Sequence, residues 1–245
     1  MNRFVAIIAR KLEPDTRRRL TSVYTTLSLG CGLCAAGSYF RLLTADPRSL
    51  APCMKTTSLL LVFTIWFCLT PPGIQNKNLL KRLLLYGIIT ILVGCNVAPL
   101  INIVVNINPQ IVLHAALGSS LLFVCLSLCA IFAPKSYYLY LAGAISTLLL
   151  MRLYICFYNL FMLYVLNSPR VFQVESSWYV VAVVACLYIL YDTQKIVDME
   201  NSQDYISDSL LLFIDLFVLF EHILRLRLSK DVVEWKKKRL NKKIK

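Results

Sequence analysis

The chain has 245 residues, of which 58% are hydrophobic, with a mean hydropathy of +0.66 and a formal net charge of +13. This length could form one or two soluble domains, but the hydrophobic residues gather into long blocks, which argues against a soluble protein. The positive charge is concentrated near the two ends and in one connector, so we expect no nucleic-acid partner.

Seven apolar blocks follow one another along the chain, each of roughly the 20 residues that cross the hydrocarbon core of a bilayer. They lack the polar/apolar alternation of membrane β-strands, so backbone hydrogen bonding in lipid predicts helices. The expected fold is an all-α polytopic membrane protein, a bundle of six to seven transmembrane segments. In chain order the blocks are Val23–Leu43, Met54–Thr70, Leu83–Val105, Ile111–Ala133, Tyr137–Leu166, Trp178–Val197 and Leu210–Leu226.

Basic residues set the expected orientation. Six precede Leu20, and Lys77, Lys81 and Arg82 lie in the second connector, so the positive-inside rule places both regions in the cytosol. Ten more lie in Arg225–Lys245, and seven full spans would put them on the opposite side. We therefore expect the last block to re-enter the membrane or to cross it incompletely. The expected parts are a basic cytosolic N-terminal segment (1–22), the transmembrane bundle (23–226) and a basic cytosolic C-terminal tail (227–245).

The end of the tail, WKKKRLNKKIK, has no acidic residue after Glu234. One interpretation is a solvated, partly disordered end that enforces orientation. The other is contact with membrane lipid, since anionic headgroups attract nearby basic residues by about 1 kcal/mol each.

The cysteines and histidines of the chain show no pattern that predicts a redox, metal-binding or catalytic site. Eight of the nine cysteines lie in or beside apolar blocks, where cysteine behaves as a small hydrophobic residue. Cys31 and Cys34 have C-x-x-C spacing but lie inside the first block, without a thioredoxin-like context. The two histidines, His114 and His222, are far apart in the sequence. We see no nucleophile–base constellation and no phosphate-binding loop, and we expect neither an enzyme nor a cofactor.

Acidic residues are distributed very unevenly. None lies between Asp46 and Glu175, whereas ten of the thirteen lie between Glu175 and Glu234. Asp192 closes the apolar run SWYVVAVVACLYILYD of the sixth block, and Asp215 lies among ten hydrophobic neighbours in the seventh. An ionised carboxylate at the centre of a membrane helix costs roughly 2.5–3.5 kcal/mol, so it must face the bundle, bind a proton or find a partner.

Asp192 and Asp215 are therefore the candidate gating residues. The residues Thr193 to Asp208 are polar enough to form a connector, so the two blocks can make a hairpin in which the carboxylates face each other. A shared proton would join the helices, whereas its loss would leave two like charges that attract a divalent cation such as Ca²⁺. Such a pair could gate a cation leak and bind Ca²⁺ transiently. Alternatively, Asp192 caps the connector and Asp215 marks the boundary of a short re-entrant helix.

Arg152 lies inside the long block Tyr137–Leu166, where an arginine needs a counter-charge or a route to water. It either extends to water at a break in this block or reaches Asp192 or Asp215 as their counter-charge.

At these residues the chain resembles the Bax inhibitor family, the transmembrane BAX inhibitor motif proteins. Tyr191–Gln194, within LYILYDTQKIV, matches the family's aromatic-D-T-Q signature, and QDYI follows at Gln203–Ile206. The stretch SLLLFIDLFVLF matches the last hydrophobic segment of the family, and Asn108-Pro109 with the following I-x-x-x-A pattern matches the connector into the fourth span. The resemblance covers nearly the whole chain.

The resemblance implies a multi-pass protein of the endoplasmic reticulum that suppresses cell death and lowers the lumenal calcium load through a pH-sensitive leak. It places the gating pair at Asp192 and Asp215, makes Ca²⁺ a permeant ion, and implies Bcl-2 family proteins and calcium-release channels as partners. The chain departs from the family at Leu211 and Asn102, where relatives carry acidic residues. A non-conducting scaffold that regulates cell death by binding other membrane proteins is the alternative.

Overall fold

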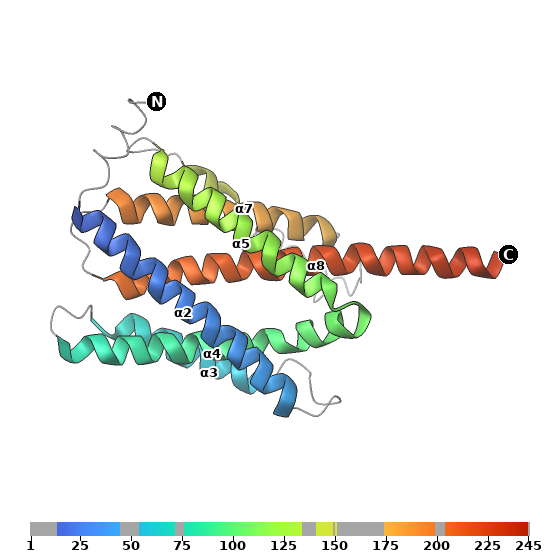
Figure 1. Ribbon diagram of the computed structural model, residues 1–245, viewed down its shortest axis with the longest axis horizontal. Helices are drawn as coiled ribbons and strands as arrows, with labels where there is room; N and C mark the ends of the chain where they lie inside the picture. The colour runs from blue at the N-terminus through green and yellow to red at the C-terminus, as the bar shows by residue number, and fades with distance from the viewer. Residues whose placement is uncertain are drawn as a thin grey trace, which may run out of the picture. The chain divides into compact units, whose positions relative to one another are not determined.

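The computed structural model describes residues 14–44, 54–71, 76–133, 141–148, 150, 174–198 and 204–244. Every regular element within these ranges is an α-helix, which confirms the expected all-α class. The helices are α2 (Pro14–Thr44), α3 (Met54–Leu69), α4 (Asn76–Ile107), α5 (Gln110–Phe132), α7 (Val174–Asp198) and α8 (Tyr205–Ile244), and residues 141–148 are helical as well (Figure 1).

The helices have the lengths and the apolar surfaces of membrane-spanning helices. Within the described ranges, four stretches are long and apolar enough to cross a bilayer, and α3 supplies a shorter apolar stretch. Large hydrophobic side chains remain exposed on them, including Leu69 (76%), Leu43 (67%) and Leu121 (67%). Extensive apolar exposure is unusual in a soluble monomer and suits contact with lipid. The chain is a multi-pass membrane protein. The four stretches are Thr16–Thr44, Leu79–Ile107, Gln110–Phe132 and Tyr179–Asp198.

The helices extend beyond the predicted apolar blocks. α4 begins at Asn76, so Lys81 and Arg82 belong to its first turns and not to a connector. The prediction of a connector from Thr193 to Asp208 was wrong over most of its length, because α7 continues to Asp198 and α8 begins at Tyr205. These polar residues include no glycine or proline, so nothing in the local sequence breaks the helix where the apolar block ends.

α8 is a single helix of 40 residues, about 60 Å long at 1.5 Å per residue. It includes the basic tail, for which a solvated, partly disordered end was one of the two interpretations of the sequence (Figure 1). The tail is helical because residues 227–244 lack glycine and proline and are rich in the helix formers lysine, arginine and leucine. The side chains beyond Ser229, and with them the predicted headgroup contacts, lie outside the described residues, as does Arg152.

The chain forms two compact units, each built from segments that are distant in sequence. The first contains Met1–Pro109 and Ile196–Ile214, and therefore α2, α3, α4 and the beginning of α8. The second contains Gln110–Lys195 and Asp215–Lys245, and therefore α5, most of α7 and the rest of α8.

Small residues allow the helices of the first unit to approach closely. α2 and α3 both pack against α4. A Cβ atom added to Gly94 of α4 would overlap the carbonyl oxygen of Cys34, and one added to Gly37 of α2 would overlap that of Ile91. Close backbone contact at glycine is a usual way for helices to associate in lipid.

In the second unit, α5 buries one narrow stripe of its surface. The buried residues recur every three or four positions, which places them on one face of the helix. They are Ile111, Ala115, Ser119, Phe123, Ser127 and Ala130. The candidate functional site of this unit is formed by α7 and α8.

Candidate functional site

Asp192 of α7 and Asp215 of α8 lie together in the second unit. Their carboxyl groups lie within hydrogen-bonding distance of each other, and the residues are only 7% and 9% exposed. Two ionised carboxylates have no proton to donate, so a hydrogen bond between them requires that one carboxyl group is protonated. Both residues are inside helices, with Asp192 six residues before the end of α7 and Asp215 ten residues after the start of α8. The structure brings these predicted residues together, and their role in gating stays a prediction.

Buried oxygen atoms without a hydrogen-bond partner among the described residues occur on both helices of this pair. Asp215 Oδ2 is buried and has no hydrogen-bond partner in the described part of the chain. The same holds for Thr193 Oγ1 and Gln194 Oε1, which follow Asp192 in the aromatic-D-T-Q signature. Buried polar atoms without a partner are uncommon in folded proteins, and oxygen atoms are the ligands that Ca²⁺ prefers. The described residues contain no cluster of three or more histidine, cysteine or acidic side chains that could hold a metal, so two carboxylates would retain a cation only weakly.

Tyr188 is a third member of this site that the sequence analysis missed. It lies one turn before Asp192 on α7 and interacts electrostatically with both Asp192 and Asp215. The spacing of four residues places Tyr188 and Asp192 on the same face of a helix, and that spacing is the signal that would have identified it. Arg152, predicted either to extend to water or to serve as a counter-charge for this pair, lies outside the described residues.

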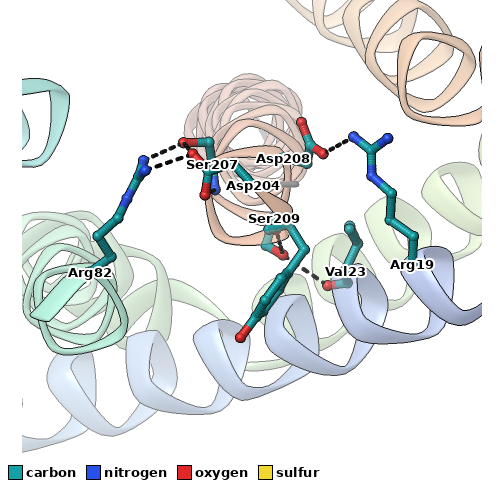
Figure 2. A network of polar contacts seen from close by, with 8 residues as sticks. Arg19, Val23, Arg82, Asp204, Ser207, Asp208 and Ser209 are labelled. Atoms are coloured by element: carbon teal, nitrogen blue, oxygen red, sulfur yellow. Dashed lines mark hydrogen bonds and ion pairs between the residues drawn. The ribbon is translucent and has the colours of Figure 1, made fainter. Parts of the chain in front are cut away.

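A second polar cluster, in the first unit, holds the beginning of α8. We call Arg19, Arg82, Asp204, Ser207 and Asp208 the α8 clamp. Arg82 of α4 forms an ion pair with Asp204 (Nη1–Oδ2 2.8 Å) and donates a hydrogen bond to Ser207 Oγ (2.7 Å). Arg19 of α2 forms an ion pair with Asp208. Figure 2 shows the two guanidinium groups pointing toward the first turns of α8 from either side.

Asp204 has two functions in the α8 clamp. It immediately precedes α8, accepts a hydrogen bond from Ser207 Oγ at 2.7 Å and is 3.5 Å from the Ser207 N–H, as expected of a helix N-cap. It also balances the charge of Arg82, whose guanidinium group lies 4.8 Å from the centre of the Phe67 ring. The nearly buried guanidinium group of Arg82 is therefore in contact with a carboxylate, a hydroxyl group and an aromatic ring face.

Uncharged contacts extend this attachment by two turns. Ser209 is fully buried, and its hydroxyl group lies 3.1 Å from the carbonyl oxygen of Val23 on α2 and 2.6 Å from that of Tyr205 (Figure 2). Phe213 packs edge-on against Tyr86 of α4, with ring centroids 6.4 Å apart. The first ten residues of α8 are thus fixed on α2 and α4 by ionic, polar and aromatic contacts.

The sequence analysis treated Arg19 and Arg82 as charges that set orientation and gave Asp204 and Asp208 no role. Arg19 is separated from Asp208 by 189 positions, and Arg82 from Ser207 by 125, so no local pattern connects them. The distribution of acidic residues was the available signal. Since only Glu13, Asp15 and Asp46 precede Glu175, most of the acidic partners available to arginines on the early helices lie near the end of the chain.

A bundle of apolar helices that buries a pair of carboxyl groups defines a polytopic membrane protein with a polar site in its interior. The chain belongs to the Bax inhibitor family, because the model of the family described as "Inhibitor of apoptosis-promoting Bax1" matches residues 16–231. The matched residues include Asp192, Asp215 and the whole α8 clamp, and they confirm the resemblance that the sequence motifs indicated.

Proteins named Bax inhibitor 1 are similar to the chain over nearly its full length. The protein from Bos taurus is 30% identical over 230 residues, which are 93% of this chain and 92% of the relative. That from Homo sapiens is 29% identical over 215 residues (87% and 86%), and that from Arabidopsis thaliana is 32% identical over 224 residues (90% and 84%).

Proposed function

We propose that this protein suppresses apoptosis from the membrane of the endoplasmic reticulum, where it acts as a pH-sensitive calcium leak gated by Asp192 and Asp215. The family and the names of the relatives support the suppression of apoptosis. The buried contact between the two aspartates is the single observation that supports the gate. The proposed orientation has the N-terminus in the cytosol, as the positive-inside rule predicts.

The gate follows from the chemistry of two acids in one buried place. With one proton shared, a hydrogen bond links α7 to α8. When that proton leaves, two negative charges face each other away from bulk water, and their repulsion is strong because the surrounding dielectric is low. A divalent cation compensates both charges, so loss of the proton favours separation of the helices and entry of Ca²⁺. Calcium flux should therefore rise with pH.

Reconstitution into liposomes tests the gate directly. Calcium flux through the purified protein is measured at a mildly acidic and a mildly alkaline pH, for the wild type and for Asp215→Asn. The wild-type flux should increase with pH by at most about tenfold per pH unit, the limit for release of one proton. The amide of Asp215→Asn cannot ionise, so the flux of this variant should not change with pH. Asp198→Asn is the matched control, because it removes a half-buried acid from α7, the helix of Asp192, and leaves the pair intact.

The second candidate is a scaffold that regulates cell death without conducting ions. It is favoured by Leu211 and Asn102, which replace acidic residues of relatives, and by the presence of only two acids at the buried site. Bcl-2 family proteins and calcium-release channels are the proposed partners, with Asp192 and Asp215 as a structural hydrogen bond. No flux at any pH, together with protection of cells from death by both the wild type and Asp215→Asn, would establish the scaffold.

A further inference from the structure

A groove of about 580 Å³ opens between α3 and α4 in the first unit. Phe63 and Trp66 of α3 and Leu84 and Ile88 of α4 line its apolar part. This volume lies within the range of about 300–1,000 Å³ that is common for small-molecule sites. We call this feature the α3–α4 groove.

The α3–α4 groove has a polar end and an apolar end. On α4 the lining runs from Lys81 to Ile88, and on α3 it runs from Thr70 back to Phe63. Lys81 and Ile88 are seven residues apart, as are Phe63 and Thr70, and seven residues correspond to about 10 Å along a helix. One leaflet contributes about half of the roughly 30 Å hydrocarbon core, so the groove spans about two thirds of a leaflet. Its polar end lies where α3 finishes and α4 begins, the position expected of a headgroup.

The walls suit a hydrocarbon chain. The rings of Phe63 and Trp66 stack with centroids 6.1 Å apart and an interplanar angle of 21°, and they form a flat aromatic surface. Trp66 is 54% exposed and Leu84 60% exposed, so this surface is accessible from the side of the bundle. Tryptophan is enriched at the level of the headgroups, where its ring contacts both the apolar core and the polar interface.

The positive charge at the polar end of the groove favours a lipid with an anionic headgroup. Lys81 is exposed and has no acidic partner among the described residues, and none of the described residues that line the groove is acidic. The neighbouring Arg82 is already paired with Asp204 in the α8 clamp. The polar end of the groove therefore carries Lys81, a cation whose charge is not balanced by the described residues around it.

We propose that the α3–α4 groove binds an anionic membrane phospholipid, with an acyl chain against Phe63, Trp66 and Ile88 and the phosphate beside Lys81. A lysine at the membrane surface favours an anionic over a neutral lipid by about fivefold. The proposal is independent of calcium conduction.

Trp66 is a reporter inside the groove. The chain has three tryptophans, so replacing Trp178 and Trp235 with phenylalanine leaves Trp66 as the only indole. The full-length variant is reconstituted into phosphatidylcholine vesicles that contain a small fraction of phosphatidylglycerol with brominated acyl chains. In a parallel sample the same fraction of phosphatidylcholine is brominated. Brominated phosphatidylglycerol should quench Trp66 with about fivefold higher apparent affinity than brominated phosphatidylcholine.

Lys81→Gln should abolish this preference and leave quenching by brominated phosphatidylcholine unchanged. Arg18→Gln is the matched control, because it removes an exposed basic residue from α2 of the same unit without changing the groove, and it should retain the preference. Circular dichroism of each variant verifies that the helices are intact. Equal quenching by the two lipids, no quenching by either, or a preference that persists in Lys81→Gln would each overturn the proposal.

Discussion

Replacing Asp204 with asparagine should destabilise the first unit by about 2 kcal/mol, because it leaves the guanidinium group of Arg82 without its counter-charge. Asparagine is as good an N-cap as aspartate, so the substitution retains the start of α8 and removes only the charge. Arg82 would keep the hydrogen bond to Ser207 and the face of Phe67. The experiment thus isolates the ion pair from the cap.

The magnitude follows from the burial of the two side chains. At 2.8 Å and an effective dielectric constant of about 20, the attraction between Arg82 and Asp204 is roughly 6 kcal/mol before desolvation is subtracted. Breaking a fully buried pair costs about 3–5 kcal/mol, whereas an exposed pair contributes about 0–1 kcal/mol. The side chain of Arg82 is 5% exposed and that of Asp204 22% exposed, so the pair lies between these limits, and a cost of about 2 kcal/mol is expected.

Thermal unfolding in detergent, followed by circular dichroism, measures the effect. A loss of about 2 kcal/mol corresponds to a decrease in Tm of about 4–8 °C for a chain of this size. Asp204→Ala should cost about 1 kcal/mol more, since it also removes the cap. Arg82→Met combined with Asp204→Asn should be more stable than Asp204→Asn alone, because the unpaired cation is gone. A Tm within about 1 °C of the wild type for Asp204→Asn would refute the buried ion pair.

Two further substitutions test the packing of the first unit by the same measurement. Gly94→Ala should destabilise by about 1–3 kcal/mol, because the new methyl group overlaps the carbonyl oxygen of Cys34, whereas Gly32→Ala has open space around the new methyl group and should leave Tm unchanged or higher. Ser209→Ala should cost about 1 kcal/mol, because it removes the hydroxyl that donates to the Val23 and Tyr205 carbonyls, and an unchanged Tm would contradict those contacts.

The existence of the helices could be predicted from the sequence, but their ends could not. An apolar block such as Ile111–Ala133 specifies a helix because lipid offers the backbone no other hydrogen-bond partner, and the observed helix is Gln110–Phe132. Outside the apolar core of the membrane that constraint does not apply, and the helix propensities of the polar residues determine where a helix ends. The polar residues after Asp192 favour a helix as far as Asp198, so the connector predicted to begin at Thr193 was placed too early.

The pairing of Asp192 with Asp215 could be predicted from the sequence, whereas the contacts of the α8 clamp could not. The difference lies in where the charged residues stand relative to the apolar blocks. A carboxyl group in the middle of an apolar block is conspicuous, and the high cost of leaving it alone predicts a partner on the adjacent helix. Arg82 stands at the edge of its block, where a basic residue already has an explanation in the orientation of the chain. Its burial, and the identity of Asp204 as its partner, depend on a contact between segments far apart in sequence.

Two aspartates on α8 show why the partner, and not the residue type, decides what a carboxyl group can do. Asp208 faces the guanidinium group of Arg19, an oppositely charged partner that requires no proton for the contact to form. Asp215, two turns later, faces another acid, and their side chains can form a hydrogen bond only when a proton is present. Mutations that change charge in the α8 clamp should therefore act on stability, whereas a change of pH should act first on Asp192 and Asp215. A helix that carries both arrangements is fixed over its first ten residues by the α8 clamp and the neighbouring contacts with α2 and α4, and places an acid of the buried pair immediately beyond them.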